Sequence, residues 1–233
     1  MELLKMTTKE VREYLKNKHT VIIPVGATEE HSDALPLGTD TFTAEKIAIE
    51  TGGKTKTIVA PTISVGNCHS VTYMFPGTIS ISPVTLTMVI KDYLESLYKH
   101  GFRNFLFVNG HGGNIAPIRC AIDSVVPIFK KSRFAVGSWW LFQELEELYD
   151  HAGHAGRGEV SMILYLHPDL VHKNLFTEEI RILPPYYVSE DLVKDRITKT
   201  GIINDTQNGN AKLGKILFEK SIKVYISILK KME

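Results

Sequence analysis

The chain has 233 residues, 43% of them hydrophobic and 23% charged, and its 27 basic side chains nearly balance 26 acidic ones. This composition excludes a disordered chain, and the length favours one domain over residues 1–233. The charge balance argues against a nucleic-acid or membrane partner, and two distant cysteines argue against a disulfide framework. Because the first residues lack the apolar core of a secretory signal, we expect a cytoplasmic protein with reduced thiols and Cys120 buried in a helix.

The first predicted elements surround a long polar segment. Residues 20–25 form a short apolar run typical of a buried strand, which stops in the segment GATEEHSDALPLGTD. A helix is expected at 41–50, ending near Gly52 and Gly53, and a second strand at 57–65. The polar segment therefore follows a strand directly, where chemistry is often found.

The middle of the chain repeats the pattern of strand and helix. Apolar residues recur at helical spacing over 84–100, and Gly101 supplies a stop signal. Residues 104–108 predict a strand and 115–130 a helix, with the tight loop NGHGGN between them. This is the pattern of a βα unit.

The last third of the chain continues the alternation. We expect a strand from Arg133, helices at 141–149 and 160–166, a long irregular excursion at 175–208, and a packing helix from Ala211. Strands alternating with helices predict an α/β fold of three layers, a mostly parallel central sheet with helices on both faces. In such sheets ligands bind at the carboxyl ends of the strands.

The first chemical cluster contains Glu29, His31 and Asp40. In an extended segment residues two apart point to the same side, so Glu29 and His31 can aim at one locus while Glu30 points away. Carboxylates and imidazole are usual ligands of zinc and manganese. The alternative is a local role, since Asp40 before a helix would also make a good N-cap.

The second cluster is the NGHGGN loop around His111. Flanking glycines let the backbone approach a ligand closely, but Gly110, Gly112 and Gly113 satisfy neither the dinucleotide nor the phosphate-loop pattern. Two alternatives stay open: a tight turn in which His111 bonds to backbone, and a phosphate at the following helix N-terminus.

The third cluster is the segment HAGHAGRGE. His154 lies in a glycine-rich loop before a helix, where an imidazole that titrates near neutral pH suits proton transfer. His151 is more typical of a structural or rim residue. Arg157 can grip an anionic substrate group or form a surface ion pair, and Glu159 can bind a metal or favour the positive end of the helix.

Together these motifs resemble the creatininase (creatinine amidohydrolase) superfamily. PVGATEEHSDALPLGTD is similar to that family's first signature, FPGTISISP to its PGT turn, VNGHGGN to its second motif, and HAGRGEVS to its HAG motif. The resemblance implies a dinuclear centre of zinc, manganese or iron. In it Asp40 bridges the ions, Glu29 and His111 complete one site, His31 belongs to the other, and His154 is the catalytic histidine.

One departure from creatininase concerns the second ion. Creatininase has an aromatic residue and a carboxylate ligand where this sequence has Gly112 and Gly113, which argues against creatinine as the substrate. Two dications need more negative charge than Glu29 and Asp40 provide. We therefore assign Glu159 to the second ion and to the catalytic set.

The resemblance implies hydrolysis of a C–N bond, in a cyclic amide or amide, within a small molecule. The ions would activate water and polarise the carbonyl, His154 would protonate the leaving nitrogen, and Trp139 or Trp140 would offer an apolar wall to a flat ring. Formamidopyrimidine-nucleotide deformylases and peptide-trimming maturases are alternatives in the same superfamily, and an inactive metal-stabilised structural subunit is one of another class. Family members form oligomers, commonly hexamers, so we expect a homo-oligomer with 175–208 as a candidate interface.

Overall fold

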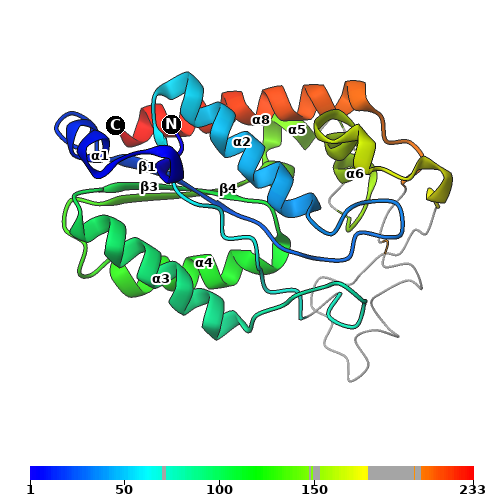
Figure 1. The fold of residues 1–233 in the computed structure, drawn as a ribbon, viewed down its shortest axis with the longest axis horizontal. Helices are drawn as coiled ribbons and strands as arrows, with labels where there is room; N and C mark the ends of the chain where they lie inside the picture. The colour runs from blue at the N-terminus through cyan, green and yellow to red at the C-terminus, as the bar shows by residue number, and fades with distance from the viewer. Residues whose placement is uncertain (70–71, 147, 149–152, 178–201, 203–205) are drawn as a thin grey trace.

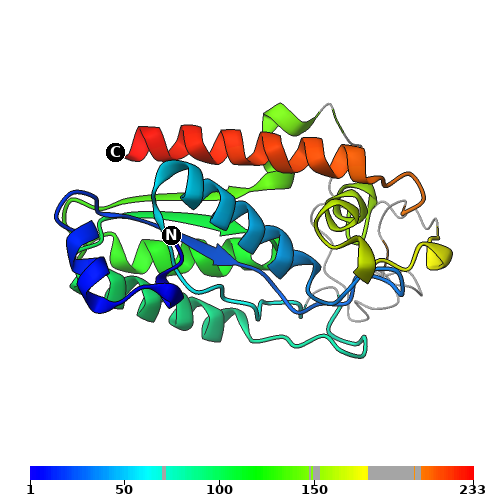
Figure 2. The same ribbon diagram turned by 45° about the horizontal axis from the view of Figure 1, so that its top comes forward.

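The computed structural model has three layers, with a parallel sheet between two sets of helices (Figures 1 and 2). The structure describes residues 1–69, 72–146, 148, 153–177, 202 and 206–233. The described sheet has the order β2-β1-β3-β4, and its strands are β1 (Thr20–Val25), β2 (Ile58–Val59), β3 (Asn104–Asn109) and β4 (Arg133–Ser138). The predicted α/β class and parallel sheet are confirmed.

The register brings the ends of three strands to one edge of the sheet. Val25 pairs with Asn109, and Asn109 pairs with Ser138. The polar segments that follow these strands therefore leave the sheet side by side. This edge is where an α/β sheet binds its ligands.

Helices α3 (Pro83–Lys99) and α4 (Ile115–Val125) cover one face of the sheet, below the strands in Figure 1. Phe105 and Phe107 of β3 pack against them, whereas Leu106 and Val108 face the opposite layer. Since successive side chains of a strand point to opposite faces, a strand covered on both sides is apolar throughout. This explains the continuous apolar runs in the sequence.

The other face carries the helices that border the candidate site. They are α2 (Thr39–Thr55), α5 (Gln143–Glu146), α6 (Arg157–Leu166) and α8 (Ala211–Met232). In both views α8 runs along the top of the molecule, and α6 lies near one of its ends (Figures 1 and 2). The short helix α1 (Thr8–Tyr14) lies at the other end of the molecule, with both termini.

Two predicted boundaries were wrong for identifiable reasons. Gly52 and Gly53 do not end α2; Gly52 packs against Val59, and the chain turns at Lys56, whose φ is 51°. The second strand is much shorter than 57–65, because its register with β1 shifts by one residue between the Ile22–Val59 pair and the isolated Val25–Ile63 bridge.

The helices expected at 115–130 and 141–149 are also shorter among the described residues. The first ends at Val125, and the second is replaced by a 3₁₀ turn (Trp139–Leu141) and α5. Cys120 was expected to be buried, but it is exposed on α4, on the side away from the buried Ile118 and Ile122.

Among the helices of the described residues, none combines the length and apolar character needed to cross a membrane.

Candidate metal centre

The candidate site lies at the carboxyl edge of the sheet, where the segments after β1 and β3 meet the first turns of α2 and α6. Asp40 is the second residue of α2, which begins after Gly38, so Asp40 is not the N-cap. A side chain at Gly110 would come within 2.2 Å of the Asp40 carbonyl oxygen. The glycine therefore lets the end of β3 approach α2 closely enough for their functional residues to meet.

The Asp40 carboxylate lies between two histidines. Its Oδ1 is 3.1 Å from His31 Nε2, and its Oδ2 is 3.1 Å from His111 Nδ1. Each oxygen thus faces a different imidazole. This is the arrangement that a carboxylate bridging two ions requires.

His111 is oriented by the loop that follows the predicted second strand. Its Nε2 donates to the carbonyl oxygen of Asn67 at 2.9 Å, because a carbonyl can only accept. The other ring nitrogen, Nδ1, then points its lone pair at Glu29 Oε2, 2.8 Å away, and at Asp40. A backbone hydrogen bond from the far nitrogen is typical of metal-binding histidines.

His31 is held in the same manner. Its Nδ1 donates to the carbonyl oxygen of Glu29 at 3.1 Å, so that Nε2 is directed at carboxylates. Besides Asp40, this nitrogen faces Glu159 Oε2 at 3.7 Å. Glu159 comes from the first turn of α6, which places it at the site that the sequence assigned to it.

Glu29 is fully buried and is fixed from one side. Thr72 donates its hydroxyl hydrogen to Glu29 Oε1 at 2.5 Å, which turns Oε2 toward His111. Sequence reasoning missed Thr72, since no spacing pattern connects it to the motifs.

With His31 and His111 neutral and protonated on the nitrogens that face backbone carbonyls, four buried atoms of this cluster take part in no hydrogen bond with any residue that the structure describes. They are Glu29 Oε2, His31 Nε2, Asp40 Oδ2 and Glu159 Oε2. Leaving such an atom unsatisfied costs about 1–3 kcal/mol or more, so four together indicate a missing partner. Each is the atom that its residue would offer to a metal ion.

Among the described residues, candidate ligand atoms converge to within 4.8 Å of one another in three groups, of which one joins Glu29 and His31 to His154. The other two divide the cluster between the two sides of Asp40. One is His31, Asp40 and Glu159; the other is Glu29, His111 and Cys68. The residues expected from the sequence are therefore brought together. Cys68 was not expected there.

The electrostatics also favour cations. Burial lowers the pKa values of His31 and His111, but Asp40 and Glu159 outweigh it at His31, and Glu29 and Asp40 outweigh it at His111. Both pKa values therefore lie well above the ordinary value. Burial raises the pKa of Asp40, but His31 and His111 hold it below its usual range. The carboxylates thus hold positive charge even without an ion, and a divalent ion can replace the bound protons.

His154 contacts the cluster from the loop before α6. Its ring lies 4.4 Å from that of His31, and its Nε2 donates to the Glu30 carbonyl oxygen at 2.6 Å. Glu30 Oε2 is 3.5 Å from the same nitrogen. As expected, the Glu30 side chain points away from the ligand cluster of Glu29, His31 and Asp40. Nothing in the sequence indicated that it would contact His154 instead.

The backbone is strained beside two of these histidines. Ser32, directly after His31, has φ 64°, and Ala155, directly after His154, has φ 53°. Residues other than glycine rarely adopt this conformation, and such strain is concentrated at functional sites.

The candidate substrate residues are placed less uniformly. Trp139 is buried in the core beside α8, with Trp140 half-buried against it, edge to face at 5.9 Å. Arg157 begins α6, and its Nε is buried without a hydrogen bond to the described residues. His151 lies outside the described residues, and His69 stacks on Tyr73.

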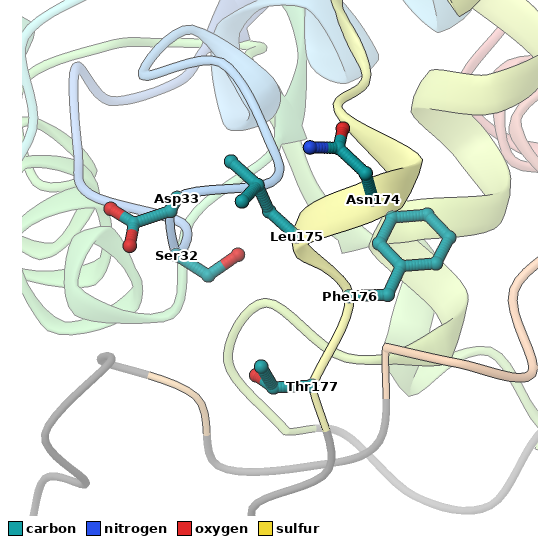
Figure 3. Close-up of a pocket in the computed structure, with 6 residues that line it drawn as sticks. All are labelled: Ser32, Asp33, Asn174, Leu175, Phe176 and Thr177. Carbon is teal, nitrogen blue, oxygen red and sulfur yellow. The ribbon is translucent and has the colours of Figure 1, made fainter.

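A depression of about 360 Å³ opens beside Glu30 and is lined also by Ser32, Asp33, Leu35, Leu37, Phe75 and Pro76. A second depression, of about 200 Å³, lies between the Ser32–Asp33 turn and residues 174–177. Figure 3 shows the Ser32 hydroxyl and the Leu175 side chain directed into this gap, and the Asp33 carboxylate directed away from it. The first depression is therefore bordered by Glu30, which contacts His154 through its carbonyl oxygen and its carboxylate.

Comparison with known proteins gives one consistent family. The family model for creatininase, described as creatinine amidohydrolase, matches residues 4–229. The mycofactocin precursor peptide peptidase of Mycolicibacterium smegmatis is 29% identical, with 87% of this chain and 81% of that protein covered. The creatinine amidohydrolase of Pseudomonas putida is 24% identical, with 85% and 84% covered.

A third relative is the 3-dehydro-scyllo-inosose hydrolase of Thermotoga maritima, 29% identical over 79% of this chain but only 63% of its own length. Among solved structures, a manganese creatininase superposes with a TM-score of 0.89 at 23% identity, covering 99% of this chain and 97% of the other. A zinc form of a creatininase variant gives 0.87 at 22% identity, with the same coverage. The predicted creatininase-like fold is confirmed.

Proposed function

Because the chain belongs to the creatininase family, we propose that it is a metal-dependent amidohydrolase that cleaves a C–N bond in a small molecule. The observation that carries this proposal is the convergence of four buried, unsatisfied ligand atoms on the two sides of Asp40. Such a donor set of carboxylates and imidazoles fits zinc, manganese or iron.

Asp40, Glu29 and His111 would hold one ion, and Asp40, His31 and Glu159 the other. The solved relatives named above contain manganese or zinc, which supports this choice of metals. Two such ions supply an activated water molecule and polarise the carbonyl group of an amide.

His154 is the proposed proton donor to the leaving nitrogen. Burial and the charge of His31 lower its pKa, but Glu29, Glu30 and Glu159 outweigh them, so its pKa lies above the ordinary value. A histidine that stays protonated near neutral pH can act as a general acid. The Glu30 carbonyl and carboxylate hold its Nε2 and so fix the direction of the ring.

The depression beside Glu30 is the proposed substrate entrance. Its lining includes Glu30, the residue that contacts His154, and combines apolar Leu35, Leu37 and Phe75 with the carboxylates of Glu30 and Asp33. This mixture suits a small ligand that has hydrogen-bond donors. Arg157 and Trp140 stay candidates for further substrate contacts.

A second candidate function is peptide trimming. It is favoured by the 29% identity to a mycofactocin precursor peptide peptidase over most of both chains. A formamidopyrimidine-nucleotide substrate remains the other alternative within the family.

The test is a substrate panel of creatinine and other cyclic amides, formamides and short peptides. We expect zinc- or manganese-loaded protein to hydrolyse one of these classes, chelation to abolish turnover, and metal to restore it. The class that is turned over decides between the candidates. Metal-loaded protein that is inactive on all classes would instead favour the structural-subunit alternative.

We also propose a cytoplasmic homo-oligomer, by analogy with the oligomers of the family. The candidate interface at 175–208 falls mostly on residues 178–201 and 203–205, outside the described part of the structure. Light scattering at micromolar concentration should give a mass several times that of one chain, and a monomer mass would refute the proposal.

A further inference from the structure

The buried thiol of Cys68 lies among ionisable groups instead of in the apolar core. Its exposed fraction is 1%, yet it belongs to none of the three apolar clusters of the described residues. Its Sγ lies within 4.8 Å of candidate ligand atoms of both Glu29 and His111. A buried cysteine that serves only as a small apolar residue would not need this position.

The backbone around Cys68 is fixed by hydrogen bonds to the other motifs. The N–H of Asn67 donates to Asn114 Oδ1 at 3.1 Å, and that of Cys68 donates to Ser80 Oγ at 2.8 Å. The Asn67 carbonyl accepts from His111 Nε2, so the same dipeptide both orients His111 and presents the thiol beside it. The position is therefore preorganised and does not depend on a mobile side chain.

The neighbouring loop cannot supply a ligand at this place. A Cβ at position 113 would lie 2.0 Å from the Asn67 carbonyl oxygen and 2.7 Å from His111 Nε2. No side chain fits there while His111 keeps its hydrogen bond. Glu29, Asp40 and His111 are three protein ligands, one fewer than a closed tetrahedral site has.

We propose that Cys68 is the fourth protein ligand of the ion held by Glu29, Asp40 and His111, bound as a thiolate. On binding, the S–H bond breaks, the proton leaves to solvent, and the sulfur donates an electron pair to the ion; nothing is oxidised or reduced. This inference rests on the proposed dinuclear centre and assigns its two positions different roles. The Cys68 position is closed by four protein ligands, whereas His31, Asp40 and Glu159 leave theirs open.

A sulfur ligand also sets the metal preference of this position. Thiolate is a soft ligand that favours zinc, cobalt or iron, whereas manganese and magnesium prefer oxygen. Cys68→Ser should therefore weaken zinc binding by at least about tenfold, the lower end of the effect of losing a group that merely orients a ligand. Manganese binding should change much less.

The test uses Cys120→Ser, in which Cys68 is the remaining one of the chain's two cysteines. Cys120 is exposed on α4, so this substitution leaves the site intact. X-ray absorption at the zinc edge should show a sulfur neighbour at about 2.3 Å. The cobalt form should show a near-ultraviolet sulfur-to-metal charge-transfer band together with the visible bands of bound cobalt.

Cys68→Ser in the same background should retain the visible cobalt bands and lose the charge-transfer band. Cobalt or zinc bound to Cys120→Ser without a sulfur neighbour would overturn the role of Cys68 and leave the proposed metal centre standing. A protein that binds neither ion would overturn the metal centre itself. Because the absorption measurement keeps Cys68 in place, it decides the question even if Cys68→Ser fails to fold.

Discussion

Asp40 presents its two carboxylate oxygens to two different histidines, Oδ1 to His31 and Oδ2 to His111, each at 3.1 Å. If Asp40 bridges the ions, Asp40→Asn removes a charged ligand from both, whereas His31→Ala removes a ligand from one. We expect the asparagine variant to retain less metal than the alanine variant when both are measured by mass spectrometry after desalting. Equal residual metal in the two variants would argue against a bridge.

Glu159→Gln keeps the shape of the side chain and removes its charge. We expect this variant to retain the ion at Glu29 and His111 and to lose affinity for the one at His31, because Glu159 Oε2 faces His31 and not His111. A glutamate that only stabilises a helix N-terminus contributes about 0.3–1 kcal/mol and would leave the metal content unchanged. Glu50→Gln, on the exposed side of α2, is the matched control.

His154→Asn tests the proposed proton donor. It should keep its metal but slow turnover by roughly two to four powers of ten, the usual contribution of a positioned acid or base. Glu30→Gln should shift the alkaline limb of the pH–rate profile to lower pH, because the Glu30 carboxylate raises the pKa of His154. If His154→Asn loses metal, His154 is a metal ligand and not only a proton donor. The control is His100→Asn, at the exposed end of α3.

Metal binding and stability should depend on pH in a defined direction. In the metal-free protein, carboxylates hold the pKa values of His31 and His111 above the ordinary 6.5. Their stabilising contribution is fully present below pH 6.5 and is lost as pH rises through the raised values. The melting temperature of metal-free protein should therefore fall over that range.

Zinc must displace the same protons, so its affinity should rise with pH, and titration in buffers of different ionisation enthalpy should reveal proton release. Zinc-loaded protein should not lose stability over the range in which the metal-free form does. Binding without proton release would mean that neither histidine is a ligand.

Much of this architecture was predictable because it depends on local patterns. The buried strands are apolar since both faces are covered, and Glu29, His31, Asp40 and His111 stand directly after strands or at a helix start. The parallel register then brings these positions to one edge without further information.

Other features depend on contacts between distant segments, which no spacing in the sequence reveals. Thr72 reaches Glu29 across 43 positions, and the Cys68 loop reaches His111 through Asn67 across 44. Glu30 meets His154 across 124 positions. The adjacent residues Glu29 and Glu30 indicate that both sides of this extended segment carry a carboxylate. They do not indicate that the Glu30 carboxylate would lie beside His154.

The most direct test of the metal centre is anomalous X-ray diffraction from crystals of zinc-loaded protein, collected on both sides of the zinc absorption edge. We predict two peaks per chain, one on each side of the Asp40 carboxylate: the first among Glu29, Asp40 and His111, the second among His31, Asp40 and Glu159. Absence of zinc peaks at Asp40 in crystals that contain zinc, or peaks confined to the protein surface, would contradict the proposed centre.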